Sequence, residues 1–122
     1  MLDNLLSKLK DSVDGNTFNK VRTLLSLEPT VYDKSYDFPN RGSDIAVVWY
    51  LFGLKPEYIY LGYYSVVSFL RRTDLKDFDR YICVPEDYVF MEYMPLFEEL
   101  GFKIHTSSYH FKALKPDSSL ID

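Results

Sequence analysis

The sequence has few of the residues on which disulfide-bonded proteins and most metal sites depend. It contains one cysteine and two histidines among 122 residues. Cys83 cannot form an internal disulfide, and it lies in an apolar run at residues 81–84, so we expect a buried thiol in a reducing, cytoplasmic compartment. With so few sulfur and imidazole ligands available, we predict no metal site and no other cofactor.

Sequence motifs for catalysis and nucleotide binding are also missing. There is no glycine-rich dinucleotide or phosphate-loop pattern, no His-Glu-x-x-His and no Gly-x-Ser-x-Gly. Cys83 with a histidine could form a nucleophilic pair. Its apolar neighbours favour a core thiol instead. The sequence therefore leans against an enzyme without deciding the question.

No hydrophobic run is long enough to predict a membrane span. Residues 45–70 are the most apolar stretch, but residues 55–57 (Lys-Pro-Glu) divide it into pieces shorter than the ~20 residues that a span needs. Charged residues from Asp3 to Asp11 interrupt the N-terminus, so no signal peptide is expected. The net charge of −4 argues weakly against nucleic-acid binding, which depends on Lys and Arg.

Apolar and aromatic residues are abundant. A chain of 122 residues with 47 % hydrophobic residues is predicted to form a single domain with a sizeable core. Eleven tyrosines and nine phenylalanines make 17 % of the chain aromatic. Many of these rings belong in the core, but tyrosine is also enriched at protein interfaces. We expect an exposed tyrosine such as Tyr63 or Tyr64 to be available to a partner.

The first 28 residues are predicted to form a helical hairpin. Apolar residues recur at helical spacing on both sides of a turn signal at residues 14–16; they are Leu2, Leu5, Leu6, Leu9 and Val13, then Phe18, Val21, Leu24 and Leu25. A DNA-reading helix-turn-helix is disfavoured because the second helix offers only Lys20 and Arg22 for contacts. The hairpin is more simply a packing element.

Residues 29–114 are predicted to form a small α/β core, followed by a tail at 115–122. We expect helices at 44–52, 66–70 and 87–100, the last kinked or restarted at Pro95, and strands at 58–62, 81–85 and 102–106. Glycines after the first and third helices predict left-handed C-caps. Alternation of helices and strands predicts a mainly parallel sheet of three to four strands with flanking helices, and residues 31–38 could form a further strand. Alternatively, residues 45–52 form a strand, since a short apolar run does not distinguish the two.

The carboxyl edge of this sheet is the predicted binding site. Strand ends and helix N-termini gather there in open parallel sheets. The candidate ligand-binding residues are Arg41, Ser43, Tyr64, Ser65, Glu86, Asp87, Ser107 and His110. Arg41 and Ser43 could hold an anion at a helix N-terminus, the two carboxylates could act as a base or accept from a ribose hydroxyl, and His110 could titrate near neutrality. Each also has an ordinary role as a cap, a dipole complement or an exposed side chain.

These observations favour a non-catalytic interaction module that acts on a protein partner. Small acidic, aromatic-rich domains include virus-encoded inhibitors of host proteins, and this composition is analogous to theirs. The alternative is a binder or processor of a small phosphorylated ligand, such as a nucleotide, seated at the carboxyl edge of the sheet. Nucleic acid and membrane are not expected partners.

Overall fold

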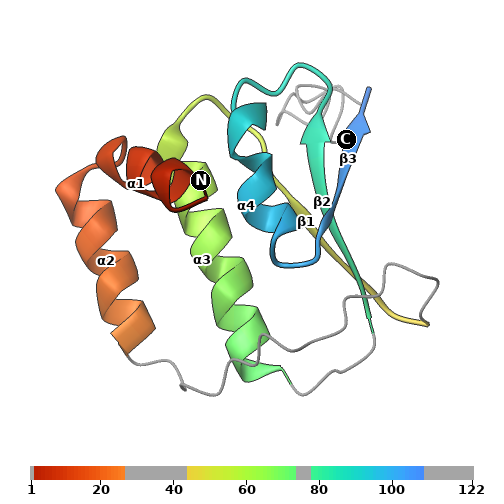
Figure 1. The fold of residues 1–122 in the computed structure, drawn as a ribbon, viewed down its shortest axis with the longest axis horizontal. Coiled ribbons are helices and arrows are strands. Elements are labelled where there is room, and N and C mark those ends of the chain that lie inside the picture. Colours follow the sequence, from red (N-terminus) through yellow and green to blue (C-terminus); the bar gives the residue numbers. More distant parts are fainter. Residues whose placement is uncertain (1, 27–43, 74–77, 109–122) are drawn as a thin grey trace, which may run out of the picture.

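The sheet of this protein consists, in the part that the structure describes, of three parallel strands. A computed structural model describes residues 2–26, 44–73 and 78–108 (Figure 1). Strands β1 (Ala46–Tyr50), β2 (Asp79–Pro85) and β3 (Lys103–Ser107) lie in the order β1-β2-β3, and both pairs are parallel. The predicted parallel α/β arrangement is confirmed here, whereas residues 31–38, which could form a further strand, and the tail at 115–122 lie outside the described residues.

Within the described ranges, four α-helices and one short 3-10 helix accompany the sheet. They are α1 (Leu2–Asp11), α2 (Gly15–Ser26), α3 (Pro56–Arg72), η1 (Met91–Tyr93) and α4 (Met94–Glu98). The connection from β1 to β2 runs through α3, and the connection from β2 to β3 runs through η1 and α4. Among the described residues, no helix is long and apolar enough to cross a membrane.

The prediction of a helix at residues 44–52 is wrong, because this segment contains strand β1. The alternative prediction of a strand at residues 45–52 is correct. Burial along β1 alternates from residue to residue: Val47 and Trp49 are half-buried, while Val48 and Tyr50 are exposed. A period of two residues is the signature of a strand with one face against other elements. Pairing with β2, in which Trp49 lies opposite Ile82, selects this conformation over a helix.

The strand expected at residues 58–62 is also wrong, because these residues form the first turns of α3. Ile59, Val66 and Leu70 are fully buried, and their spacing of seven and four residues defines one stripe of a helix. Pro56 lies in the first turn, where its fixed φ suits the helix and its missing N–H has no partner to lose. The helix expected at 66–70 is the C-terminal part of the same element.

The end of α4 follows the predicted C-cap. Gly101 has a φ of +88°, and its N–H donates to the Glu98 carbonyl oxygen at 2.9 Å. The Phe102 N–H donates to the Phe97 carbonyl oxygen at 3.1 Å, and the Phe102 ring is buried. Pro95 lies in the first turn of α4, so the alternative in which this proline starts a second helix is correct.

The N-terminal segment forms both expected helices, but they pack mainly on the rest of the domain. The Asp14 carboxylate accepts a hydrogen bond from the Thr17 N–H at 2.6 Å, which caps α2 and lowers the pKa of Asp14. The main contacts of α1 are with α3, η1 and α4, and those of α2 are with α3. Leu9 and Val21 are the residues that each helix buries in the core.

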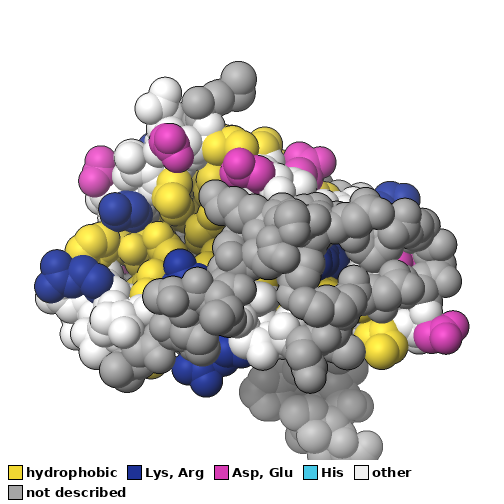
Figure 2. Space-filling model, turned by 60° about the horizontal axis from the view of Figure 1, so that its bottom comes forward, with side chains coloured by type: hydrophobic (Ala, Val, Ile, Leu, Met, Phe, Trp, Pro, Cys, Tyr) yellow, Lys and Arg dark blue, Asp and Glu magenta, His cyan; other side chains and the backbone are white. Residues whose placement is uncertain are grey.

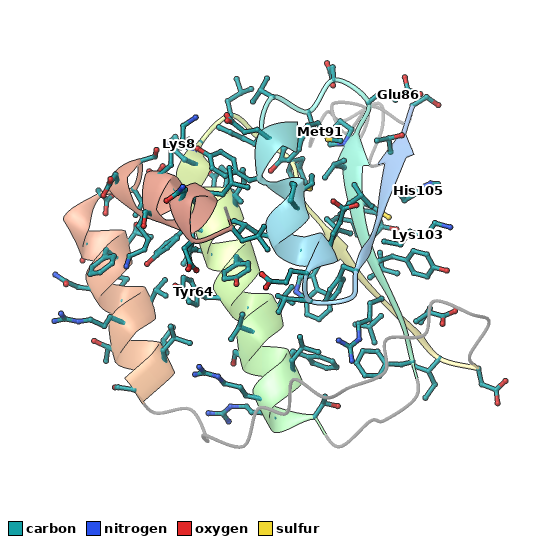
Figure 3. The ribbon with its side chains drawn as sticks, in the orientation of Figure 1. Lys8, Tyr64, Glu86, Met91, Lys103 and His105 are labelled. Carbon is teal, nitrogen blue, oxygen red and sulfur yellow. The ribbon has the colours of Figure 1, made fainter. Side chains whose placement is uncertain are left out.

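Both crossover helices lie on one face of the sheet. In Figure 1, α3 and α4 lie on the same side of the strands. Right-handed crossovers between strands laid down in the order β1-β2-β3 require this arrangement. The opposite face, which no described helix covers, carries Val48 opposite Tyr81 and Lys103, and Tyr50 opposite Cys83 and His105. Figure 3 shows Lys103 and His105 pointing away from α4.

The core lies between the sheet and the helices. Its fully buried apolar side chains include Leu9, Ile59, Val66, Leu70, Phe78, Ile82, Val84, Leu96 and Phe97. Arg80 is buried among them with 1 % of its surface exposed. Its Nη1 donates to the Leu100 carbonyl oxygen at 2.8 Å, and its guanidinium lies 4.5 Å from the centre of the Phe78 ring. A buried cation is tolerated only with such partners.

A valine-to-alanine substitution is predicted to lower the free energy of unfolding by different amounts on the two faces of the sheet. Val84 on β2 is fully buried, whereas Val48 on β1 is 40 % exposed. We expect Val84→Ala to lower the free energy of unfolding by roughly 2 kcal/mol, because a cavity remains in the core. Val48→Ala should cost less than about 1 kcal/mol. Urea unfolding of both variants tests this, and equal losses would contradict the assignment of the faces.

Candidate functional site

The structure brings three of the predicted site residues together at the carboxyl edge of the sheet. Glu86 and Asp87 follow β2 directly, and Ser107 is the last residue of β3. The Glu86 N–H donates to the Ser107 carbonyl oxygen at 3.1 Å, which ties the two strand ends (Figure 3). Both carboxylates are exposed in a loop and do not open a helix, because η1 begins only at Met91. Arg41, Ser43 and His110 lie outside the described residues.

Tyr64 and Ser65 are not at this edge, which corrects the prediction for both. They lie in the middle of α3, about 12 Å along the helix from its first residue. The prediction for both residues depends on a strand at residues 58–62, and these residues belong to α3 instead. Of helix α3, only the first turn lies at the carboxyl edge of the sheet.

Tyr64 belongs to a cluster of packed rings. Its centroid lies 4.9 Å from that of Tyr60 and 5.2 Å from that of Tyr63, both nearly perpendicular to it. Burial raises the pKa of Tyr64, and burial together with the charge of Tyr64 raises the pKa of Tyr60 to about 12. Tyr63 and Tyr64 are half-buried, so they are not the exposed tyrosines that the composition predicts. Tyr50 and Tyr58 are, with 62 % and 51 % of their surfaces exposed.

A hollow lies between β1 and α3. Its volume is about 540 Å³. The strand side consists of Trp49, Tyr50, Leu51 and Phe52, and the helix side consists of Tyr58, Leu61, Gly62 and Ser65. We call it the strand-side hollow. Aromatic walls with few polar groups are typical of sites that bind apolar ligands or side chains.

The geometry of this hollow depends on two glycines. A Cβ atom on Gly62 would lie 2.8 Å from Cδ2 of Leu51, so the missing side chain lets Leu51 pack directly on α3. Gly53 has a φ of +104°, which turns the chain from β1 toward α3. A Cβ atom there would lie 2.9 Å from the Tyr58 ring. The Tyr58 ring therefore lies against bare backbone at the entrance to α3.

Trp49 fixes the inner wall. Its indole Nε1–H donates to the Ser65 hydroxyl at 3.3 Å, and its ring makes edge contacts with Phe69 and Phe102 at centroid distances of 5.3 and 5.6 Å. A large ring held by three neighbours changes position little when a ligand binds. Trp49 is also the only tryptophan of the chain, so its fluorescence reports on this hollow.

A second, smaller depression lies on the other side of α3. The helix-side hollow, between α2 and α3, has a volume of about 270 Å³ and is lined by Val21, Leu24, Leu25, Leu61, Tyr64, Ser65 and Ser68. It shares Leu61 and Ser65 with the strand-side hollow. The two depressions therefore flank one exposed stripe of α3. Figure 2 shows hydrophobic side chains gathered over the part of the molecule that contains α2 and α3.

Large apolar side chains around the two hollows remain in contact with solvent. They are Leu24, Tyr50, Phe52, Tyr58 and Leu61, with exposed fractions between 41 % and 62 %. We call these five residues and the two hollows the α3 surface. Scattered exposed leucines are ordinary, but a contiguous apolar patch marks a binding site or an interface. The signal for it in the sequence was the surplus of aromatic residues, which did not indicate their place.

Cys83 and His105 are neighbours on the uncovered face of the sheet. They are register partners on β2 and β3, and Cys83 is half-buried, which corrects the prediction of a core thiol. The alternating pattern of β2 directs Cys83 to the face opposite Ile82 and Val84. Burial raises the pKa of the Cys83 thiol, and an activated nucleophile requires the opposite shift. Residues 2–26, 44–73 and 78–108 contain no group of three or more acidic, His or Cys side chains that could hold a metal ion.

Comparison with known proteins does not add to this picture. No family model matches the chain, and no curated protein and no solved structure matches it either. The geometry of the described residues is therefore the basis for any functional proposal.

The raised pKa of Cys83 predicts a slow thiol. At pH 7 we expect native protein to react with iodoacetamide more slowly than free cysteine does, and the rise in rate with pH should be displaced to higher pH, because less thiolate is present. His105→Ala should leave the rate unchanged. Mass spectrometry of the alkylated protein over time measures both. A thiol that reacts faster than free cysteine, or that slows in His105→Ala, would indicate a catalytic pair.

Proposed function

We propose that this protein is a non-catalytic interaction module that binds a protein partner through the α3 surface. The observation that carries the proposal is the contiguity of exposed apolar side chains around two hollows that share Leu61 and Ser65. Aromatic residues are enriched where protein interfaces derive most of their affinity. The walls of the strand-side hollow contain four of them: Trp49, Tyr50, Phe52 and Tyr58.

The exposed area of the patch is that of a functional surface. An aromatic side chain buries roughly 150–250 Å² in an interface, so Tyr50, Phe52 and Tyr58 at their exposed fractions offer on the order of 300 Å² before the leucines are counted. The largest apolar patch on a typical monomer covers about 300–600 Å² and is often functional. The expected analogy with inhibitors of host proteins is part of this proposal: a small domain that covers a partner's binding segment acts as its inhibitor.

The proposal predicts that a single charge introduced at Leu61, which lines both hollows, abolishes binding of the partner. Leu61 is 41 % exposed and lines both hollows, so Leu61→Glu should disrupt the surface with little effect on the fold. We expect affinity for the natural partner to fall by a factor of about 30 or more, which is about 2 kcal/mol at a hot spot. Isothermal calorimetry measures it with a partner captured from the cells that make the protein.

Val89→Glu is the matched control, because Val89 is 59 % exposed in the loop after β2 and lines neither hollow. Partner binding should add a change in Trp49 fluorescence that Val89→Glu retains and Leu61→Glu loses. Equal affinities of the two variants would refute the α3 surface as the interface.

A second candidate function is binding of a small phosphorylated ligand at the carboxyl edge. One observation favours it: no side chain caps the first turn of α3, and Lys55 directly precedes that turn. Free N–H groups at a helix N-terminus attract anions. Glu86 and Asp87 oppose it, because they add two negative charges to the same edge of the sheet.

A thermal-shift screen tests the second function without knowledge of a protein partner. We expect a thermal-shift screen with nucleotides and sugar phosphates to leave the melting temperature unchanged. A phosphorylated ligand at 100 times its dissociation constant would instead stabilise the protein by about 2.7 kcal/mol. A clear shift that Lys55→Gln removes would favour the second function over the first.

A further inference from the structure

The outer edge of β3 is a row of backbone groups that no strand covers within the described part of the chain. The sheet order β1-β2-β3 places β3 at one side, and Figure 1 shows no described helix or strand beyond it. An edge strand presents N–H and C=O groups with which another strand can pair, and proteins either protect such an edge or use it for binding. Strand β3 has no proline, and its one lysine is its first residue.

The register identifies the residues of β3 whose backbone points outward. The Ser107 carbonyl oxygen accepts a hydrogen bond from the first N–H after β2 at 3.1 Å, so Ser107 bonds to β2. In a parallel pair, residues that bond to the neighbouring strand alternate with residues that point away from it. Lys103 and His105 therefore also bond to β2, in agreement with their register. The N–H and C=O groups of Ile104 and Thr106 point to the open side.

Only an extended chain matches this row of groups. The outward residues recur every two positions, about 6.6 Å apart, which is the repeat of another strand. An antiparallel strand exchanges two hydrogen bonds with each outward residue. A helix cannot do so, because its backbone groups are already bonded within the helix. The chemistry of the edge therefore selects a second strand.

The side chains of β3 fit a second copy of the same strand. We consider two copies that run antiparallel with His105 opposite His105. Ile104 then lies opposite Thr106, and pairs that contain β-branched residues stabilise sheets. Lys103 lies opposite Ser107, so no lysine faces another. A register centred on Lys103 would place two lysines directly opposite each other, which is destabilising.

We propose that β3 pairs edge to edge with β3 of a second copy of this chain, in antiparallel orientation and centred on His105. Two three-stranded sheets then become one continuous sheet across a two-fold axis, the commonest symmetry of protein dimers. Because β3 has five residues, the contact is short, about 17 Å, and a small interface gives a weak, concentration-dependent dimer. This edge is separate from the α3 surface, since none of the residues that line the two hollows belongs to β3.

Sedimentation velocity over a concentration series tests the proposal at about pH 8, where histidine is uncharged. We expect a monomer at about 1 µM and a dimer at about 1 mM, as for weak complexes. Thr106→Pro removes an outward N–H without removing a bond to β2, so it should weaken self-association by a factor of about ten or more.

Val48→Pro is the matched control on the other edge of the sheet. The Leu51 N–H donates to the Cys83 carbonyl oxygen at 2.9 Å, so residues 47, 49 and 51 bond to β2 and Val48 points away from it. The same substitution at this edge should leave the dimer intact. Circular dichroism and thermal melting establish that both variants are folded.

The two-fold pair at position 105 tests the register. His105 is exposed on the uncovered face of the sheet, so substitutions there should leave the fold unchanged. His105→Lys and His105→Asp each place two like charges directly opposite one another, and each variant alone should self-associate several-fold more weakly. In an equimolar mixture the charges are opposite, so a mixed dimer should form several-fold more tightly than either variant alone. Native mass spectrometry measures the mixed species.

A protein that stays monomeric at about 1 mM overturns the inference. A dimer that neither Thr106→Pro nor the position-105 variants weaken overturns it as well. A dimer that Leu61→Glu abolishes and Thr106→Pro retains forms through the α3 surface, which overturns the pairing of β3 while the proposed binding surface stands. Loss of the dimer in Thr106→Pro without any effect at position 105 supports the edge and overturns the register. Should Thr106→Pro fail to fold, the charge pair at position 105 decides the question.

Discussion

The handedness of the two crossovers constrains everything else in this structure. Each connection between parallel strands must turn to the right. Because β1, β2 and β3 lie in the sheet in their order along the chain, two such turns deliver α3 and η1–α4 to the same face. The core is then one layer deep, between one sheet and one set of helices. Helices α1 and α2 make their main contacts with that helical layer.

The openings on either side of α3 follow from how closely that helix approaches β1. Leu51 packs on the bare backbone of Gly62, and the Trp49 indole reaches the Ser65 hydroxyl. Small residues at 62 and 65 bring the helix near the strand, but they also remove the side chains that would otherwise fill the space above it. The aromatic residues at the end of β1 and the start of α3 then border depressions instead of closing them. The small residues Gly62 and Ser65 therefore account both for the close packing of α3 on β1 and for the depressions on the surface beside it.

Much of this fold was predictable from the sequence, and the errors share one physical cause. The C-cap at Gly101, the helix start at Pro95 and the strands predicted at 81–85 and 102–106 depend on local signals, and the structure confirms them. Residues 45–52 and 58–62 are both short, apolar and rich in β-branched or aromatic residues. Their conformations were exchanged because the partner strand decides them: Trp49 pairs with Ile82, whereas Ile59 belongs to a stripe completed only at Val66 and Leu70. Because the two predictions were exchanged, Tyr64 and Ser65 were predicted at the carboxyl edge of the sheet, whereas they lie in the middle of α3. For the same reason the sequence did not predict the α3 surface.

The buried guanidinium of Arg80 has a consequence for the order in which the domain can assemble. Arginine keeps its charge under all ordinary conditions, so it cannot enter an apolar core as a neutral group. The carbonyl oxygen of Leu100, one of its partners, takes its place only after α4 has formed and the chain has turned at Gly101 toward β3. Until then, burial of β2 against the helices would leave that charge without one of its compensating contacts. We therefore expect β2 to gain its full stability only when α4 and β3 have formed, so that these three elements fold as one cooperative unit.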